Sequence, residues 1–161
     1  MVAAFNDPKT QGRLAMKLML AIAFVAATSS TLAFGQSASD SAAIAATAHD
    51  YIDGWYTADG PRMAKALHPE LAKRIVMADS SGQNYLQQMG ASHLTAATRQ
   101  GGGNRTPQAK RLNDVTVLDI YRNAAVAKIV ASDWIDYLEL AKWNGRWVIV
   151  NVLWELKPRG S

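Results

Sequence analysis

The chain has 161 residues, 49% of them hydrophobic, with no cysteine and a formal net charge of +4 at pH 7. This length suits one domain with its own hydrophobic core. The lack of cysteine excludes a disulfide framework, a thiolate nucleophile and a cysteine zinc site.

Residues 1–35 have the pattern of a secretory signal peptide. Lys17 precedes an apolar run from Leu18 to Ala27, and the small residues Ala33 and Gly35 suit a cleavage site. Met16 is a candidate for the true start. Because the apolar run is too short to span a bilayer, we expect no membrane contact after cleavage. We therefore predict that residues 36–161 form a single domain. We expect this domain to be periplasmic or secreted.

This leader also accounts for much of the positive charge. It contains Lys9, Arg13 and Lys17 against the single acidic residue Asp7. In the remaining chain the numbers of basic and acidic residues are nearly equal, so we expect no nucleic-acid partner.

The segment from Asp40 to Ala58 is predicted to form an amphipathic helix. Its apolar residues recur at three- and four-residue spacing: Ile44, Ala48, Tyr51, Ile52 and Trp55. Asp59-Gly60-Pro61 then ends this helix and begins a short second one, which Pro69 ends. Residues 71–77 predict a strand, and residues 83–99 predict a third helix that ends at Gly101-Gly102-Gly103.

The remainder is rich in β-branched and aromatic residues. Three consecutive antiparallel strands are predicted, at residues 114–121, 124–142 and 146–157. Asn144-Gly145 favours a type I′ turn between the last two, which pairs Trp143 with Arg146.

That register gives the last hairpin two unequal faces. One face mixes apolar and polar residues: Trp134, Asp136, Leu138, Leu140, Ile149, Asn151, Leu153 and Glu155. The other is almost entirely apolar: Ile135, Tyr137, Val148, Val150, Val152 and Trp154. We expect the mixed face to line a pocket and the apolar face to be covered by helices or by a second subunit. A bulge would swap the faces beyond it.

Four segments carry a family resemblance: Tyr51-Ile52-Asp53-Gly54-Trp55-Tyr56, residues 66–74, residues 133–138 and residues 144–154. With the order of elements, they resemble the putative lumazine-binding family of the nuclear transport factor 2-like superfamily, from Ile44 to Pro158. The resemblance implies an α+β cone, with three N-terminal helices packed on a strongly curved, mainly antiparallel β-sheet. It implies binding of a small planar heteroaromatic or apolar ligand, and we expect a homodimer through the outer sheet face.

The same superfamily contains ketosteroid isomerase, which needs a tyrosine from the first helix and a carboxylate base on the strand after the short helix. Tyr51 aligns with that tyrosine, but Arg74-Ile75-Val76 offers no carboxylate. This departure favours binding over catalysis. The alternative is a small cofactor-free isomerase or dehydratase that uses Asp136, with Tyr51 or His68 as its partner. A third possible function is that of a structural or interaction module whose cone is filled by side chains.

Ligand contacts are predicted for seven residues: Tyr51, Trp55, His93, Trp134, Asp136, Asn151 and Glu155. Aromatic rings stack on planar ligands, although core rings look the same from sequence. In the predicted register Asp136 and Glu155 are near neighbours that share a pocket, with Asn151 as an orienting group. The alternative for Asp136 and Glu155 is a polar sheet rim, and Asn151 suits an orienting role in either case. The three histidines, His49, His68 and His93, lack metal-ligand spacing, so we expect neither a metal nor a cofactor.

Overall fold

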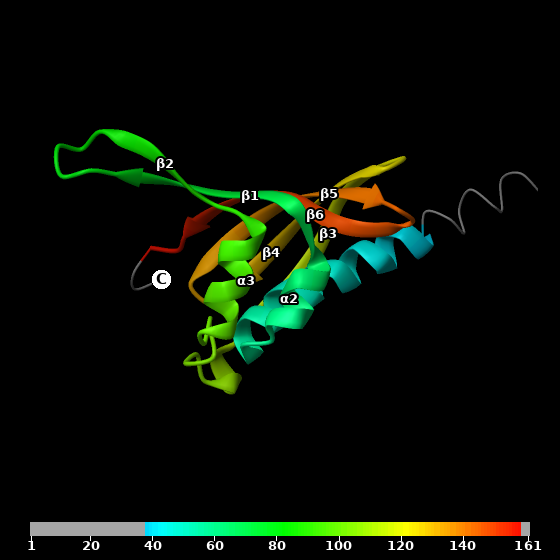
Figure 1. Ribbon diagram of the computed structural model, residues 1–161, viewed down its shortest axis with the longest axis horizontal. Coiled ribbons are helices and arrows are strands. Elements are labelled where there is room, and N and C mark those ends of the chain that lie inside the picture. Colours follow the sequence, from blue (N-terminus) through cyan, green and yellow to red (C-terminus); the bar gives the residue numbers. More distant parts are fainter. Residues whose placement is uncertain (1–37, 159–161) are drawn as a thin grey trace, which may run out of the picture. The chain divides into compact units, whose positions relative to one another are not determined.

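The computed structural model describes residues 38–158, so the predicted signal peptide, its cleavage site and the candidate start Met16 lie outside the described residues. The chain from Asp40 onward forms one compact unit. Within it, three α-helices lie on one face of a six-stranded curved sheet (Figure 1). The α+β class is therefore confirmed.

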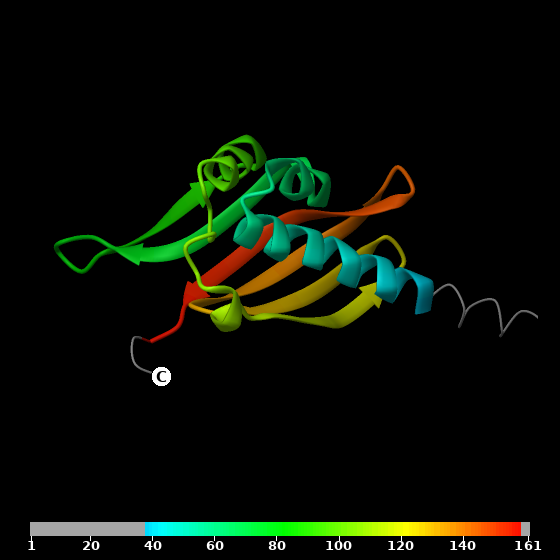
Figure 2. The same ribbon diagram turned by 90° about the horizontal axis from the view of Figure 1, so that it is seen from below.

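The N-terminal helix, described over residues 38–57, lies across the sheet (Figure 2). Its buried face carries the predicted spacing, with Ile44, Ala48, Tyr51 and Ile52 almost fully buried. The second helix, α2 (Gly60–Ala66), begins as predicted, because the Asp59 side chain accepts a hydrogen bond from the Arg62 N–H and Pro61 lies in the first turn. No helix within residues 38–158 is long and apolar enough to cross a membrane.

The predicted third helix is wrong in its first half. Residues 84–89 form strand β2 (Asn84–Met89), which pairs with β1 (Leu67–Ala78), and only α3 (Ala91–Arg99) is helical. The turn residue Asp79 accepts hydrogen bonds from the Ser81 and Gln83 N–H groups, which favours a hairpin there. Because α3 follows this hairpin, the three helices do not all precede the sheet in sequence.

Four strands, not three, form the rest of the sheet after a short 3₁₀ helix (Gln108–Lys110). They are β3 (Asn113–Tyr121), β4 (Ala124–Ala131), β5 (Trp134–Trp143) and β6 (Arg146–Leu156). The sheet order is β2-β1-β6-β5-β4-β3, and only the β1–β6 pair is parallel. The sheet is therefore mixed but mainly antiparallel.

The β5–β6 hairpin has the predicted turn, with positive φ angles at Asn144 (50°) and Gly145 (79°). The predicted pairing holds from Trp143 with Arg146 to Leu140 with Ile149. Val150 is then left out of the pairing, so Glu139 faces Asn151 and Asp136 faces Trp154. This bulge swaps the two faces of β6 beyond it.

The predicted faces are consequently right on β5 and wrong on the far half of β6. Asp136 and Leu138 lie on the buried face toward the helices, where Val152 joins them. Leu153 is instead 54% exposed on the outer face, and Glu155 is exposed there too. Asp136 and Glu155 therefore do not share a pocket.

Candidate functional site

A buried ion pair links two strands that are not neighbours. The Lys73 ammonium on β1 donates to Asp136 Oδ1 on β5 at 2.5 Å, across the intervening strand β6. Asp136 is fully buried and Lys73 is 8% exposed. Burying two charges in this way requires good geometry and further hydrogen bonds around them.

Two neutral donors complete the surroundings of the Asp136 carboxylate. The Trp134 indole N–H donates to Oδ2 at 2.6 Å, and the Tyr51 hydroxyl donates to Oδ1 at 3.4 Å. Tyr51 also accepts a hydrogen bond from Lys73 at 2.8 Å. These hydrogen bonds join the four side chains into one connected network. We call them the Lys73 cluster.

Burial changes the acid–base chemistry of this cluster. Desolvation raises the pKa of Tyr51 well above 10.0, and the Asp136 charge adds to that effect. Desolvation also lowers the pKa of Lys73 from its usual 10.5, although the Asp136 charge opposes this. The phenol therefore stays a neutral donor, while Lys73 is the group in the cluster whose proton is easier to remove than usual.

A cavity of about 350 Å³ lies against the Lys73 cluster, within the range of small-molecule sites. It is lined mainly by aromatic and apolar side chains from both the helices and the sheet: Tyr51, Trp55, Lys73, Met89, Leu94, Asp133, Trp134, Trp154 and Leu156. Lys73 Nζ lies 4.7 Å from the centre of the Trp154 ring. The open volume favours a binding cavity over the alternative of a filled cone.

The aromatic side chains that line the cavity are held by contacts with one another and with the glycine loop behind Trp55. Trp55 and Trp134 pack edge to face, with ring centroids 6.5 Å apart. Behind Trp55, the loop glycines leave room for its ring: a Cβ at Gly103 would lie 2.6 Å from Trp55 Cδ1. The Gly103 N–H also donates to the Trp55 carbonyl at 3.0 Å. Gly102 and Gly103 are thus packing residues that position Trp55.

The structure gathers four of the predicted site residues, Tyr51, Trp55, Trp134 and Asp136, at this cavity or directly behind it. The remaining four lie elsewhere. His93 is exposed on α3, and Glu155 is exposed on the outer face. His68 packs against Trp143 near the hairpin turn, with its Nδ1 accepting from the Glu70 N–H.

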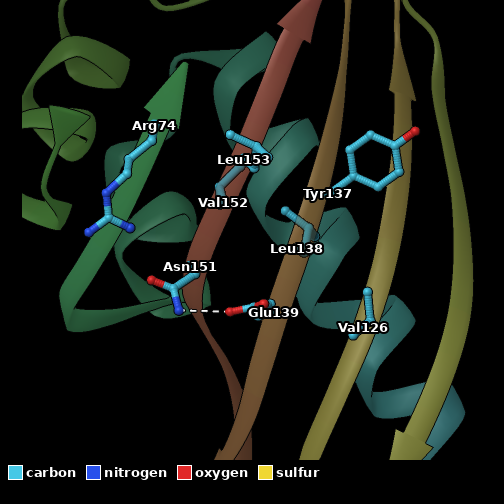
Figure 3. Close-up of a pocket in the computed structure, with 8 residues that line it drawn as sticks. All are labelled: Arg74, Val126, Tyr137, Leu138, Glu139, Asn151, Val152 and Leu153. Atoms are coloured by element: carbon cyan, nitrogen blue, oxygen red, sulfur yellow. Dashed lines mark hydrogen bonds between the residues drawn. The ribbon is translucent and has the colours of Figure 1, made fainter. Parts of the chain in front are cut away.

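Asn151 lines a different hollow, of about 350 Å³, on the uncovered face of the sheet (Figure 3). There its side-chain amide donates to Glu139 at 2.8 Å. Arg74 borders one side of this hollow, and Tyr137 and Leu153 supply apolar surface (Figure 3). It has no buried charge comparable to the Lys73–Asp136 pair, so we regard the inner cavity as the candidate site.

Lys73 and Trp154 are site residues that the sequence reasoning did not find. Lys73 lies two residues from each of the buried residues Leu71 and Ile75, so all three share one face of β1. That period of two was a signal for an inward-facing lysine. Trp154 was assigned to the opposite face because the bulge at Val150 leaves no mark in the sequence. No group of three or more His, Asp or Glu residues placed to hold a metal ion occurs within residues 38–158.

The fully buried Asp136 has both carboxylate oxygens engaged, Oδ1 by Lys73 and Tyr51 and Oδ2 by Trp134. A general base must reach the proton that it removes. This arrangement favours Asp136 as a positioning residue that holds Lys73, Tyr51 and Trp134 in place at the cavity.

A sequence model of the family described as "Putative lumazine-binding" matches residues 39–155. No curated protein matches the chain. Similar solved structures include two nuclear transport factor 2-like proteins of unknown function. The one from Shewanella baltica has 20% identity, covering 72% of this chain and 92% of that chain with a TM-score of 0.55. The one from Methylobacillus flagellatus has 21% identity, with 72% and 90% covered and a TM-score of 0.58.

A third similar structure is a nuclear transport factor 2-like protein with a cystatin-like fold from Novosphingobium aromaticivorans. It has 14% identity, covers 81% of this chain and 90% of that chain, and has a TM-score of 0.60. At these identities the structures show a shared fold.

Proposed function

Since the chain belongs to the putative lumazine-binding family, we propose that it is a binding protein for a small planar molecule, held in the cavity beside the Lys73 cluster. The cavity corresponds, in this proposal, to the interior of the cone that the superfamily resemblance implies. The binding needs no cofactor and no chemical step.

The observation that carries this proposal is the combination of an aromatic wall with one buried polar centre. Trp55, Trp134 and Trp154 supply flat apolar surface, which suits offset stacking with a planar ring. Lys73 and Tyr51 supply hydrogen bonding at one end of the cavity. A mainly apolar pocket with a few placed polar groups is the usual design of a small-molecule site.

Tryptophan emission tests the proposal. Lumazine, pterin and lumichrome, a flavin-like compound, are titrated into the purified domain, and saturable quenching is expected. Trp55→Phe should reduce the signal because the ring lines the cavity. The matched control is Trp143→Phe. Trp143 is 53% exposed beside the hairpin turn, so its emission should not change on ligand binding, and this variant should show the same quenching as the wild type. If none of the three compounds gives a saturable change, the binding proposal fails.

We also propose that the protein forms a homodimer through the outer sheet face. Tyr137 and Leu153 are 45% and 54% exposed there and make an apolar surface without a helix above it (Figure 3). Arg74 lies beside Leu153 on the neighbouring strand, and Glu139 lies two residues from Tyr137 on β5. In the proposed two-fold arrangement the arginine of one copy meets the glutamate of the other. Leu153→Glu should shift the sedimentation coefficient from dimer to monomer, and an unchanged value would contradict the interface.

We propose that residues 1–35 direct export of the protein, and fractionation of cells tests this. The full chain should be found in the periplasm or medium in a shortened form, whereas a chain starting at residue 36 should stay in the cytoplasm. Equal distribution of the two would overturn the signal-peptide proposal.

A further inference from the structure

The Lys73 ammonium has one unused donor at the cavity. Two of its hydrogen bonds go to Asp136 Oδ1 and Tyr51 Oη. Among residues 38–158 no acceptor is found for its third hydrogen, and the nearest aromatic surface is the Trp154 ring at 4.7 Å. Because Lys73 lines the cavity, a ligand bound there can supply the missing acceptor.

The charges around the cavity limit what that acceptor can be. Asp136 already neutralises Lys73, and the other members of the Lys73 cluster, Tyr51 and Trp134, are uncharged donors. The only other charged residue that lines the cavity within residues 38–158 is the exposed Asp133, which is negative. A ligand anion would therefore be a second negative charge against one cation, and transferring it from water has a large desolvation cost.

A carbonyl oxygen of an uncharged ligand can bind the Lys73 ammonium without the desolvation cost of an anion. It accepts a hydrogen bond from the ammonium, which as a charge-assisted bond is stronger than a neutral one. A ligand cation is disfavoured for the converse reason, since it would face the Lys73 ammonium in a site of low dielectric constant.

We infer that the cavity selects uncharged planar ligands that carry a carbonyl oxygen, with Lys73 as the specificity-determining donor and Asp136 as the charge that excludes anions. This inference rests on the proposed binding function and adds to it the class of ligand. Lys73 contacts the ligand, whereas Asp136 is a positioning residue that acts through Lys73.

Three size-matched probes separate charge from hydrogen bonding. They are 2-acetylnaphthalene, which is neutral with a carbonyl, 2-naphthoate, which is an anion, and 2-ethylnaphthalene, which has no acceptor. Titration calorimetry gives the Kd of each for the purified domain. We expect the ketone to bind about tenfold or more tightly than the ethyl compound, as a hydrogen bond to a charged group implies. The carboxylate should bind more weakly than the ketone.

Two variants then assign the effect to the ion pair. Lys73→Met should remove the preference for the ketone over the ethyl compound, so that the ratio of their two Kd values approaches one. Lys128→Met is the matched control, because Lys128 lies over Tyr137 on the outer face and should leave all three values as in the wild type. Asp136→Asn leaves Lys73 without its counter-charge, so the carboxylate should now bind better than the ketone. Circular dichroism checks that each variant is folded.

The outcomes are distinguishable. Equal binding of the ketone and the ethyl compound to the wild type, or tighter binding of the carboxylate, overturns the inference and leaves the binding function standing. Because the wild-type series already decides this, an unfolded Asp136→Asn variant does not remove the test. If none of the three compounds binds, the inference fails, and the titration with lumazine, pterin and lumichrome decides the proposed function separately.

Discussion

Lys73 and Asp136 meet over the strand that separates them, with a contact of 2.5 Å between Nζ and Oδ1 on the helix-covered face of the sheet. Their strands, β1 and β5, both pair with β6, which places Val152 opposite Lys73 and Trp154 opposite Asp136. The ion pair therefore holds β1 against β5 across β6 and fixes the polar end of the cavity.

Removing one member of this pair should be more harmful than removing both. Lys73→Met leaves the fully buried Asp136 carboxylate without its cation, and breaking such a pair typically costs about 3–5 kcal/mol. The double variant Lys73→Met/Asp136→Leu should cost less than either single change, because no unpaired charge remains. Urea denaturation measures the free energy of unfolding in each case.

Arg62 is the control, since it is 34% exposed and pairs with the part-exposed Asp50 and Asp53. Arg62→Met should cost about 0–1 kcal/mol for each of the two lost ion pairs. If Lys73→Met costs no more than this control, the buried pair does not have the role assigned to it.

Gly103→Ala should disturb the cavity from behind. The added Cβ would lie 2.6 Å from both Cδ1 and Nε1 of Trp55, so the ring or the loop must move. Overpacking of this kind typically costs about 1–3 kcal/mol, and the affinity for any ligand that contacts Trp55 should fall. Gly90→Ala is the matched control, because its Cβ would meet only the Leu71 carbonyl oxygen, at an ordinary 3.8 Å. Equal effects of the two changes on ligand affinity would show that Gly103 does not position Trp55.

The titration of Tyr51 should differ between the folded and unfolded protein. Its pKa is raised well above 10.0 by burial and by the Asp136 charge, so the folded protein keeps this phenol protonated at a pH where the unfolded chain loses the proton. The wild type should therefore lose stability relative to Tyr51→Phe as the pH rises above 10.0 toward the raised value. Phenolate absorbance and urea denaturation at each pH measure the two effects. A constant stability difference over that range would be inconsistent with the raised pKa.

Asp40 gives a prediction of the opposite sign. Its hydrogen bond from Lys142 at 2.7 Å, with a second from the Trp147 indole at 3.0 Å, holds its pKa below 3.8. The resulting stabilisation is present above 3.8 and is lost as the pH falls through the lowered value. The stability difference between wild type and Asp40→Asn should be constant near neutral pH and shrink in acid. Lys142→Gln should reproduce this loss, and a difference that grows in acid would contradict the assignment.

The regular parts of this fold were readable from the sequence because local physics decides them. The N-terminal helix has an apolar stripe that its burial reproduces, and Asn144-Gly145 tolerates the positive φ angles that its turn requires. Strand β2 was missed because Leu86 and Met89 share a spacing with a helix. In the structure Leu86 is 61% exposed, so that spacing marks no buried face.

Only part of the candidate site could be predicted from the sequence, because local periodicity identifies some of its residues and not others. Tyr51 and Trp134 follow from helix and strand periodicity, and both line the cavity. Trp154 and Glu155 exchanged faces because Val150 is a bulge, which changes the pairing of every later residue on β6. Lys73 shares the period of two with the buried Leu71 and Ile75, but that signal was passed over because a lysine in a strand is more often solvated.

The central claim is that a planar ligand occupies the cavity beside the Lys73 cluster, and the indole N–H resonances of the five tryptophans test it most directly. In a heteronuclear NMR titration with lumazine, the signals of Trp55, Trp134 and Trp154 should shift and saturate together, because these three rings line the cavity. The signals of Trp143 and Trp147 should stay in place, since Trp143 is exposed beside the turn and the Trp147 indole is bound to Asp40. Unchanged positions for the three cavity tryptophans, or a shift confined to Trp143, would contradict the account.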